Sequence, residues 1–352
     1  MAIKYRWLAQ QLRKKVYDNM EKGVPRLPSE QEMCRHYGVS RQTVRQSLAL
    51  LEQEGLITRK QGSGSFITGL TSGRNTVGLL LADDQDSYRA ALLEEIRQSL
   101  SQKGFTANVY LTGNRICAEH AILSELLETP PRGLLVEGVK SALPNPNLDL
   151  YRQLHSMGVP AVFLRGSYGA LPQAPCIRED DTAGTALLTA HLLHQGHRDV
   201  GAVFQLDDAQ GQRRYQGFAE TLRGAGLPVR DEQICWYVTE DLEPSYSAPY
   251  GFLLRMAQTR LQGCTAVICQ NGDAAYWLSR LLPDTVMASC EDTCAGTGNL
   301  LPFTALERRP RELGKAAVQA ITDRLRGLPA YSRELPLKLA VRDGDRLPSA
   351  TP

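Results

Sequence analysis

The 352-residue chain has no long apolar run. Charged residues or Gly interrupt every hydrophobic stretch well short of the ~20 residues that a membrane-spanning helix needs. The cationic N-terminus lacks the apolar core and cleavage site of a signal peptide. No compositionally biased tract is present, and 42% hydrophobic and 22% charged residues are typical of folded domains. We therefore expect a globular cytoplasmic protein of two or more domains, with no membrane partner.

The cysteines lack the spacing of a metal or redox site. None of the eight forms a Cys-x-x-Cys pair, and only Cys290 and Cys294 lie close in sequence, without a neighbouring His. Structural zinc sites need clustered ligands. We predict reduced, mostly buried thiols and no bound metal.

Motifs of two large enzyme classes are also missing. Ala-Asp-Asp-Gln-Asp stands at 82–86, where a dinucleotide-binding protein would have Gly-x-Gly-x-x-Gly. No Gly-x-Ser-x-Gly elbow is present, and most of the six His fall within or beside predicted helices. The sequence predicts no catalytic residues, no cofactor and no enzymatic activity.

What the sequence does have is a segregated charge. Of the 40 Lys and Arg, 12 lie in residues 1–73, against 6 of the 38 Asp and Glu, which gives this segment a net charge of +6. The other 279 residues carry 28 basic and 32 acidic side chains, a net charge of −4. A small basic segment joined to a larger acidic one is typical of a polyanion-binding module attached to another domain.

The basic segment predicts three helices. Apolar residues recur at helical spacing over 4–20, and Ser29 with Glu32 forms a capping box that begins a second helix ending near Tyr37. A turn at Gly38 leads to a third helix, 41–54, which Ser40 caps. Its apolar face holds Val44, Leu48 and Leu51, and its opposite face holds Arg41, Gln42, Arg45 and Gln46. This pattern fits a helix-turn-helix whose later helix enters the major groove of double-stranded DNA.

A predicted hairpin follows the third helix. Residues 56–59 and 65–68 are strand-like, and the loop 60–64 (Lys-Gln-Gly-Ser-Gly) has little bulk to prevent approach to a phosphate backbone. An Arg-rich helix face or a Gly-Ser-Gly turn alone is usually only a solvated surface. Together, in this order and with the charge excess, they predict an α+β winged helix-turn-helix over residues 1–70.

These residues resemble the DNA-binding domain of the GntR family of bacterial transcription regulators. The resemblance is carried by Leu-Pro-Ser-Glu at 27–30, Gly-Val-Ser-Arg-Gln-Thr-Val-Arg at 38–45, Leu-Glu-Gln-Glu-Gly-Leu at 51–56 and Gln-Gly-Ser-Gly-Ser-Phe-Ile at 61–67. The resemblance implies that operator DNA contacts residues of the second and third helices and of the wing. We expect the DNA-binding residues to be Lys4, Ser29, Arg35, Arg41, Gln42, Thr43, Arg45, Gln61, Gly62, Ser63 and Gly64.

The chemistry of these side chains suggests separate roles. An Arg in the major groove can donate two hydrogen bonds to guanine, so Arg45 is the expected base reader. Lys4, Arg35 and Arg41 are expected to hold phosphates, and Ser29 to donate to a phosphate at a helix N-terminus.

After a linker at 71–75 the pattern changes to an α/β fold. Short apolar runs alternate with amphipathic helical stretches over residues 76–343, followed by a tail at 344–352. Such runs indicate buried parallel strands. The runs are 77–82, 105–111, 133–136, 159–164, 199–204, 265–269 and 285–288, and the helical stretches are 88–103, 116–128, 148–157, 182–195, 211–225, 245–262, 273–282 and 311–326.

Polar residues follow several of these strands, where α/β proteins bind ligands. They are Asp83, Asp84, Glu137, Arg165, Asp207, Asp208, Asn271, Glu291 and Asp292. Carboxylates, amides and guanidinium groups suit the paired hydroxyls of a sugar. Each of these residues alone can equally begin a loop or cap a helix. Tyr237 and Trp277 are candidate stacking groups, although a core position is the more ordinary expectation for each.

The body resembles the effector domain of LacI/GalR-type repressors, which are related to periplasmic sugar-binding proteins. The resemblance rests on Gln-Gly-His-Arg at 195–198, Asp-Ala-Gln-Gly-Gln-Arg-Arg-Tyr-Gln-Gly-Phe at 208–218, Ile-Cys-Gln-Asn at 268–271 and Leu-Gly-Lys-Ala-Ala at 313–317. It implies a two-lobed α/β fold over residues 76–343.

A GntR-type head on such a body, with Val-Glu-Gly-Val-Lys-Ser-Ala-Leu at 136–143 and Gly-Ser-Tyr at 166–168, resembles the AraR-type family of L-arabinose repressors. The resemblance implies effector-binding residues Tyr88, Glu137, Lys140, Tyr168, Arg214, Asn271 and Glu291. Two departures stand out: Asn-Gly at 271–272 replaces the usual Asn-Asp, and Ser-Cys-Glu-Asp at 289–292 replaces Gly-Tyr-Asp-Asp. The longer Glu291 side chain leaves the identity of the sugar open.

The sequence therefore predicts a repressor that binds an operator as a homodimer and is released by a small sugar such as L-arabinose. Two alternatives remain. One is a GntR-type regulator with a pyridoxal-phosphate-binding body, for which Lys140 and Lys315 lack a recognisable cofactor context. The other is a regulator with a chorismate-lyase-like sensor for a phosphorylated sugar, for which the body is too long. Whether sugar causes induction or corepression is not predicted.

Overall fold

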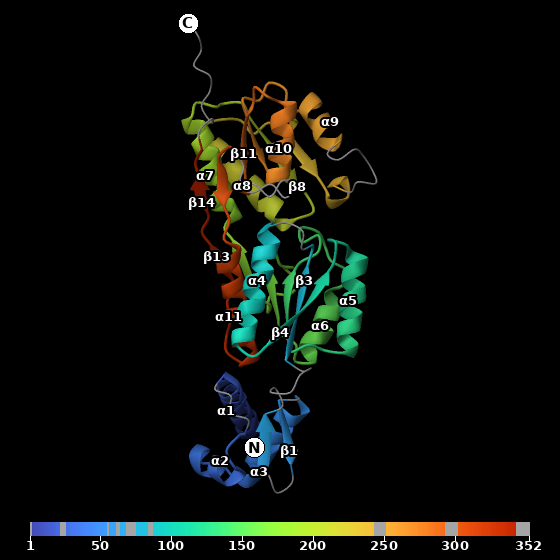
Figure 1. Cartoon of the computed structure of the whole chain (residues 1–352), viewed down its shortest axis with the longest axis vertical. Helices are drawn as coiled ribbons and strands as arrows, with labels where there is room; N and C mark the ends of the chain where they lie inside the picture. Colours follow the sequence, from blue (N-terminus) through green and yellow to red (C-terminus); the bar gives the residue numbers. More distant parts are fainter. Residues whose placement is uncertain are drawn as a thin grey trace.

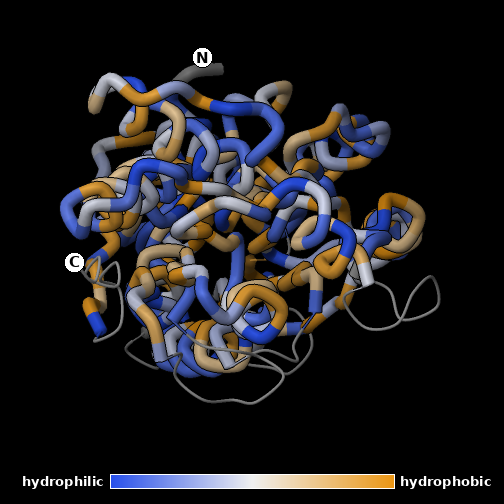
Figure 2. Tube along the Cα trace, turned by 90° about the horizontal axis from the view of Figure 1, so that it is seen from above, coloured by the Kyte–Doolittle hydropathy of each residue, from blue (hydrophilic) through white to orange (hydrophobic). Residues whose placement is uncertain are grey.

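The computed structural model describes residues 2–21, 26–54, 56–60, 64–67, 75–83, 87–242, 251–292 and 302–342. Three units follow one another along the long axis of the molecule (Figure 1). They are an N-terminal head, a proximal lobe beside the head, and a distal lobe at the far end. Seen down the long axis, hydrophilic and apolar residues alternate along the chain, as expected of amphipathic elements around buried cores (Figure 2).

The head is a three-helix domain with a two-stranded hairpin. Ser29 and Glu32 form the predicted capping box, Gly38 ends the second helix at φ 62°, and the Ser40 side chain caps the third. Leu12, Met33 and Leu48 are among the buried residues that join the helices into one core. The elements are α1 (Ala2–Glu21), α2 (Glu30–Tyr37), α3 (Arg41–Gln53), β1 (Ile57–Lys60) and β2 (Gly64–Ile67).

The proximal lobe is a parallel six-stranded sheet covered by helices on both faces. Its strand order is β13-β7-β6-β5-β3-β4. The strands are β3 (Thr76–Leu81), β4 (Thr106–Leu111), β5 (Gly133–Glu137), β6 (Ala161–Leu164), β7 (Cys176–Glu179) and β13 (Arg333–Leu335). The helices are α4 (Ser87–Gln102), α5 (Ile116–Glu128), α6 (Leu148–Ser156) and α11 (Pro310–Leu325). Helices α4 and α11 pack together, as do α5 and α6 (Figure 1).

The distal lobe repeats this architecture with one antiparallel edge. Its strand order is β14-β12-β11-β10-β8-β9, and β14 runs antiparallel to β12. The strands are β8 (Val200–Gln205), β9 (Ile234–Tyr237), β10 (Ala266–Cys269), β11 (Val286–Ser289), β12 (Ala305–Glu307) and β14 (Lys338–Ala340). The helices are α7 (Asp181–His194), α8 (Ala209–Gly224), α9 (Gly251–Thr259) and α10 (Gly272–Leu281), with short 3₁₀ turns η2 (Asp231–Gln233) and η3 (Thr239–Leu242).

The chain passes between the lobes after β7, after β12 and between β13 and β14. These crossings lie on one side of the molecule, beside the edges formed by β13 and β14, whereas β4 and β9 form the opposite edges. Residues that follow the strands of each sheet contact the other lobe, so the carboxyl ends of the two sheets face each other. This is the edge at which parallel sheets bind ligands.

The predicted two-lobed α/β fold is confirmed, and five short strands were not predicted. These are β7, β9, β12, β13 and β14. Each has three or four residues, and sequences such as Arg-Glu-Leu and Lys-Leu-Ala carry no strand periodicity. None of the helices in the described ranges combines the length and the apolarity needed to cross a membrane.

Candidate functional site

The exposed face of α3 presents the predicted groove-reading residues. Arg41, Gln42 and Arg45 are exposed on one side of the helix, while Val44 and Leu48 are buried on the other. The Arg45 guanidinium donates to the Glu30 carboxylate at 3.0 Å, and the Arg45 side chain remains 64% exposed. Glu30 therefore orients Arg45 without enclosing it, and the pair must separate or rotate if Arg45 binds a base.

The other predicted DNA-binding residues lie around this helix. Ser29 begins α2, where its hydroxyl bonds Glu32 at 2.8 Å, and Arg35 is exposed on the same helix. Lys4 is exposed on α1. The Thr43 hydroxyl lies 2.9 Å from the Ser40 hydroxyl, in the first turn of α3. Gln61, Gly62 and Ser63 lie outside the described residues.

Gly64 is required where the wing returns to the head. Its φ of 106° is a conformation that L side chains rarely adopt. A Cβ atom here would also lie 2.9 Å from the Arg26 guanidinium, which stacks on the Phe66 ring at 5.7 Å. Gly64 thus allows Arg26 to lie across the base of the wing.

Arg214 is one of the most enclosed charged groups between the lobes. Its side chain is 1% exposed, its Nε donates to Asp181 at 3.1 Å, and its Nη1 donates to the Gln270 carbonyl at 2.6 Å. Its Nη2 has no hydrogen-bond partner, and the nearest carboxylate oxygen, on Glu291, is 3.8 Å away. The Gln270 Oε1 atom is likewise buried without a partner. Neighbouring carboxylates hold the pKa of Arg214 above its ordinary value despite burial.

Glu137 anchors an arginine cluster at the carboxyl end of β5. Its carboxylate accepts from Arg89 at 3.0 Å and 3.2 Å, from Arg165 at 2.6 Å and from the Ala82 amide at 3.1 Å. Burial alone would raise the pKa of Glu137, but the Arg89 and Arg165 guanidinium groups hold it far below its ordinary value. Arg165 also donates to Gln210 of the distal lobe.

Tyr88 lies under a second arginine. The Arg308 guanidinium stacks 3.6 Å from the centre of the Tyr88 ring, and it donates to Glu179 at 2.6 Å and to Glu291 at 2.6 Å. The Tyr88 hydroxyl lies 3.3 Å from Glu179. Arg308 therefore connects the predicted residues Tyr88 and Glu291 across the lobes.

Asn271 and Lys140 lie just beyond two other strands, Asn271 after β10 and Lys140 after β5. The Asn271 Oδ1 caps α10 by accepting from the Ala274 amide at 2.9 Å, and its Nδ2 lies 3.4 Å from the Tyr237 hydroxyl. Lys140 reaches into the distal lobe and forms ion pairs with Asp207 and Glu240.

Tyr168, which was predicted to bind the effector, is instead bonded within the proximal lobe. Its hydroxyl donates inside the proximal lobe, to Glu119 at 3.0 Å and the Val139 carbonyl at 2.9 Å, and its ring packs on Phe163. The buried Glu119 carboxylate needs hydrogen-bond donors, and this explains the position of the Tyr168 hydroxyl better than a role in ligand binding does.

The two candidate stacking residues differ in burial. Tyr237 is buried in the distal core, as ordinarily expected, whereas Trp277 is 39% exposed on α10 and is not a core residue.

Several residues of this region were not predicted. They are Arg89, Glu179, Asp181, Gln210 and Arg308. Glu179 ends β7, Asp181 begins α7 and Arg308 follows β12, and both strands carry too little pattern to be predicted. Arg89 and Gln210 lie in the first turns of α4 and α8, just beyond the strand-end residues that were predicted.

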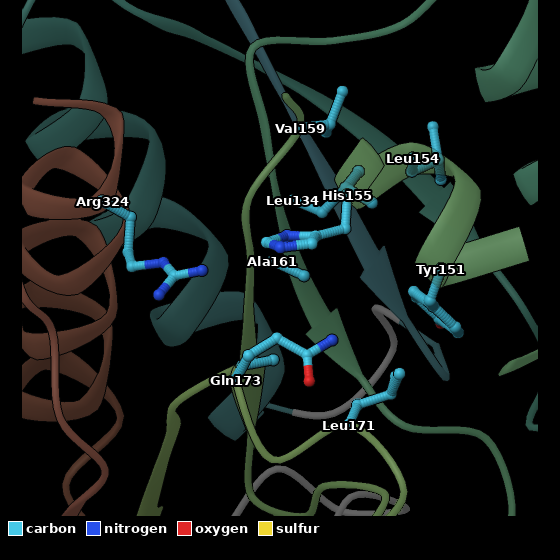
Figure 3. A pocket seen from close by; sticks show the side chains of 10 residues that line it. Leu134, Tyr151, Leu154, His155, Val159, Ala161, Leu171, Gln173 and Arg324 are labelled. Carbon is cyan, nitrogen blue, oxygen red and sulfur yellow. The ribbon is translucent and has the colours of Figure 1, made fainter. Parts of the chain in front are cut away.

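A pocket in the proximal lobe has a volume of about 10 Å³, room for about one water, among Leu134, Tyr151 and His155 (Figure 3). No group of three or more His, Cys, Asp or Glu among the described residues is arranged to hold a metal ion.

Two family models match the chain. Residues 74–282 match the periplasmic binding proteins and sugar binding domain of the LacI family, and residues 4–67 match the bacterial regulatory proteins of the gntR family. The first match spans more than half of the sequence, so the chain belongs to the LacI-type sugar-binding family. More particularly, it is a DNA-binding regulator in which a GntR-type winged head is fused to a LacI-type sugar-binding body.

Curated relatives share both parts. An arabinose metabolism transcriptional repressor of Halalkalibacterium halodurans is 28% identical over 91% of this chain and 89% of its own length. The protein of the same name from Geobacillus stearothermophilus is 29% identical over 90% of each chain. Among solved structures, transcription regulator CcpA of Lactococcus lactis matches 77% of this chain and 98% of its own, with a TM-score of 0.64 and 17% identity. That structure supports the fold alone.

Proposed function

We propose that the protein is a transcriptional repressor that binds its operator as a homodimer and is released by L-arabinose or a closely related pentose. The relatives that span both domains are named for arabinose metabolism, which supports this effector. The groups that would bind the sugar are polar side chains near the carboxyl ends of the strands, among them the predicted residues Arg214, Asn271 and Glu291.

One observation carries the assignment of the sugar site. Arg214 Nη2 is a buried donor and Gln270 Oε1 is a buried acceptor, and neither has a partner. Leaving such groups unpaired costs about 1–3 kcal/mol each, which a ligand that both donates and accepts would recover. A sugar hydroxyl does both. Both atoms are shielded in this arrangement of the lobes, so a ligand reaches them only when the lobes separate.

Glu291 supports a pentose of specific stereochemistry. Its Oε1 accepts from Arg308 and lies 3.8 Å from Arg214, which leaves Oε2 for a ligand hydroxyl. A Glu at this position extends its carboxylate by about 1.5 Å beyond that of the Asp usual in the family. The preferred epimer therefore depends on which hydroxyl this longer side chain meets.

A sugar phosphate is the competing ligand, because several arginines lie between the lobes. The five arginines are matched, however, by five carboxylates. Arg89 and Arg165 pair with Asp83 and Glu137, and Arg213, Arg214 and Arg308 pair with Asp181, Glu179 and Glu291. A phosphate would have to break these pairs. A neutral sugar fits this charge balance better.

The pyridoxal-phosphate alternative is not supported. The body has the sugar-binding fold, and the Lys140 ammonium is held by two carboxylates.

The test is a thermal-shift panel on the full chain. Binding only to the folded state stabilises it by about 2.7 kcal/mol at 100 times the Kd. L-arabinose should raise the Tm, and D-xylose, D-ribose, D-arabinose and L-arabinose 5-phosphate should raise it less. Operator duplexes selected in vitro from a random pool should then dissociate on addition of the same sugar. A larger shift with the phosphate than with any neutral pentose would contradict the proposal.

A further inference from the structure

We propose that Asn114 and Lys140 of the proximal lobe, with Asp207, Thr239 and Glu240 of the distal lobe, form an interlobe latch that holds the lobes together without a bound sugar. The latch residues lie after β4, β5, β8 and β9. These strands are on the side of the sheets away from the three crossings. The latch therefore joins the lobes on the side opposite the three chain crossings.

The Lys140 ammonium is fully occupied by the distal lobe. Its Nζ donates to Asp207 at 3.0 Å and to the two Glu240 oxygens at 2.7 Å and 3.0 Å. An ammonium has three donors, so none is left for a ligand. Lys140 was predicted to bind the effector, and these contacts assign it to lobe closure instead.

Asn114 makes the second connection. Its Nδ2 donates to the Thr239 hydroxyl at 2.6 Å across the lobes, and its Oδ1 accepts from the Lys140 amide at 2.7 Å. Thr239 in turn donates to Asp207 at 2.7 Å. The two proximal residues are thus joined to each other, and their distal partners are joined as well.

The backbone is strained at the proximal residues. Asn114 and Lys140 have φ values of 54° and 43°, in the left-handed region that Lys seldom adopts. Residues held in such conformations cluster at functional and switch positions, where surrounding contacts must compensate. Both side chains here make that compensation with the opposite lobe.

The burial of the latch is uneven. Asp207 is 1% exposed, Lys140 is 15% exposed, and Glu240 is 55% exposed. Only the inner pair is shielded from water, where an ion pair is screened little by salt. Loss of Lys140 leaves Asp207 buried without its cation, so closure should weaken more than loss of Glu240 would cause.

The test measures the distance between the lobes in the full chain without sugar. Spin labels are attached to noncanonical residues at Ala121 on α5 and Gln258 on α9, which are exposed on the latch side. Labelled protein is diluted with unlabelled protein, and pulsed electron resonance reports distances within one chain. Because no sugar is present, failure of the arabinose assignment would leave this result unaffected.

We expect wild type to give one short distance. Lys140→Met should add a longer population, with the open-to-closed ratio rising about tenfold, the effect of losing a few shielded polar contacts. Asn114→Gly should act in the same direction, because it removes the amide that donates to Thr239 across the lobes. The variant should still fold, since Gly adopts the left-handed backbone without strain. Arg230→Met is the matched control, since its 2.5 Å pair with Asp199 lies within the distal lobe.

Two outcomes would overturn the proposal. One is a wild-type distance distribution in the Lys140→Met, Asn114→Gly double variant, with an unchanged Tm showing that the protein is folded. The other is an equal change in the Arg230→Met control. If Lys140→Met alone fails to fold, Glu240→Gln keeps the inner pair and should give a smaller shift in the same direction.

Discussion

The charged side chains between the lobes are buried as ion pairs, and this determines how much each replacement destabilises the protein. Removing one partner of a buried ion pair leaves the other charge without compensation, which costs about 3–5 kcal/mol. Arg214, Asp181 and Glu179 are each no more than 1% exposed. Replacing one of them with a neutral residue should therefore lower both stability and sugar affinity. A substitution that keeps the charge but changes the geometry separates the two effects.

Arg214→Lys is such a substitution. Lysine keeps the positive charge beside Asp181 but lacks the planar guanidinium fork that bonds Asp181 and the Gln270 carbonyl and also presents Nη2. We expect L-arabinose affinity to fall at least tenfold while operator affinity without sugar is unchanged. Isothermal titration with the sugar and fluorescence anisotropy with the operator would measure both.

Arg223→Ala, an exposed position on the same helix α8, serves as the control for Arg214. It should leave sugar affinity unchanged. Wild-type sugar affinity in Arg214→Lys would mean that the unpartnered Nη2 is not a ligand donor.

Glu137 should make the body acid-sensitive. A carboxyl group whose folded pKa is lowered contributes stability in full above its ordinary pKa of 4.5, and this contribution is lost as pH falls through the folded value. We expect the wild-type Tm to fall as the pH is lowered from 5 to 3. Glu137→Gln should lower the Tm at pH 7 and show a smaller loss on acidification, which differential scanning calorimetry would detect.

Equal acid sensitivity in Glu137→Gln and wild type would assign the loss to other carboxylates. Asp181 and Asp207 are the candidates, because their pKa values are also held below normal by neighbouring donors and cations.

The sequence located some of these residues and missed others for physical reasons. Arg214 and Glu137 belong to motifs or to clear strand ends, so their position followed from the pattern. Arg308 follows a three-residue strand, and no periodicity marks so short an element. Tyr168 was misplaced because the buried carboxylate of Glu119, which attracts its hydroxyl, lies 49 residues away in sequence.

Among whole elements, helices with local end signals were the most predictable. The capping box at Ser29, the turn at Gly38 and the cap at Ser40 are all encoded within four residues, and each forms as predicted. The short edge strands β13 and β14 pair with β7 and β12, which lie far from them in the sequence. Their pairing is a tertiary effect, and nothing local in the sequence reveals it.

The recognition helix α3 allows base reading to be separated from phosphate binding. Arg45→Ala should abolish preference for the selected operator over random duplex, a loss of about 1–3 kcal/mol per bidentate contact. Lys4→Ala should weaken binding to all duplexes about equally and reduce the salt dependence of affinity by about one counterion. Anisotropy titrations at several salt concentrations would distinguish the two.

Both head variants should bind sugar as wild type does. Arg45→Ala also removes the cation beside Glu30, so Glu30→Gln is a useful companion, because it frees Arg45 without removing it. Retention of operator preference in Arg45→Ala would assign base reading to another residue of α3.

At the scale of the whole molecule, the head contacts the proximal lobe at the amino ends of its strands, opposite the carboxyl ends where we propose that sugar binds. Arg132 donates to the Glu54 carbonyl at 3.1 Å, at the end of α3, and Gln10 donates to the Gly327 carbonyl at 3.3 Å. The Glu54 carboxylate is also held by Arg13 at 2.6 Å. A groove of about 850 Å³ lies beside these contacts. The end of the recognition helix is thus connected to the lobe by few polar bonds.

This junction should transmit lobe movement to the operator. A hundredfold loss of operator affinity on sugar binding needs about 2.7 kcal/mol of coupling, and coupling cannot exceed the difference between the sugar's binding free energies for the two arrangements. Arg132→Ala removes the bond to the end of α3, so we expect the sugar to change operator affinity less than tenfold while sugar affinity stays the same. Gln10→Ala, at the other contact, should reduce coupling by a smaller amount. Operator titrations with and without saturating L-arabinose would measure the ratio, and full release of Arg132→Ala by sugar would mean that coupling does not pass through this junction.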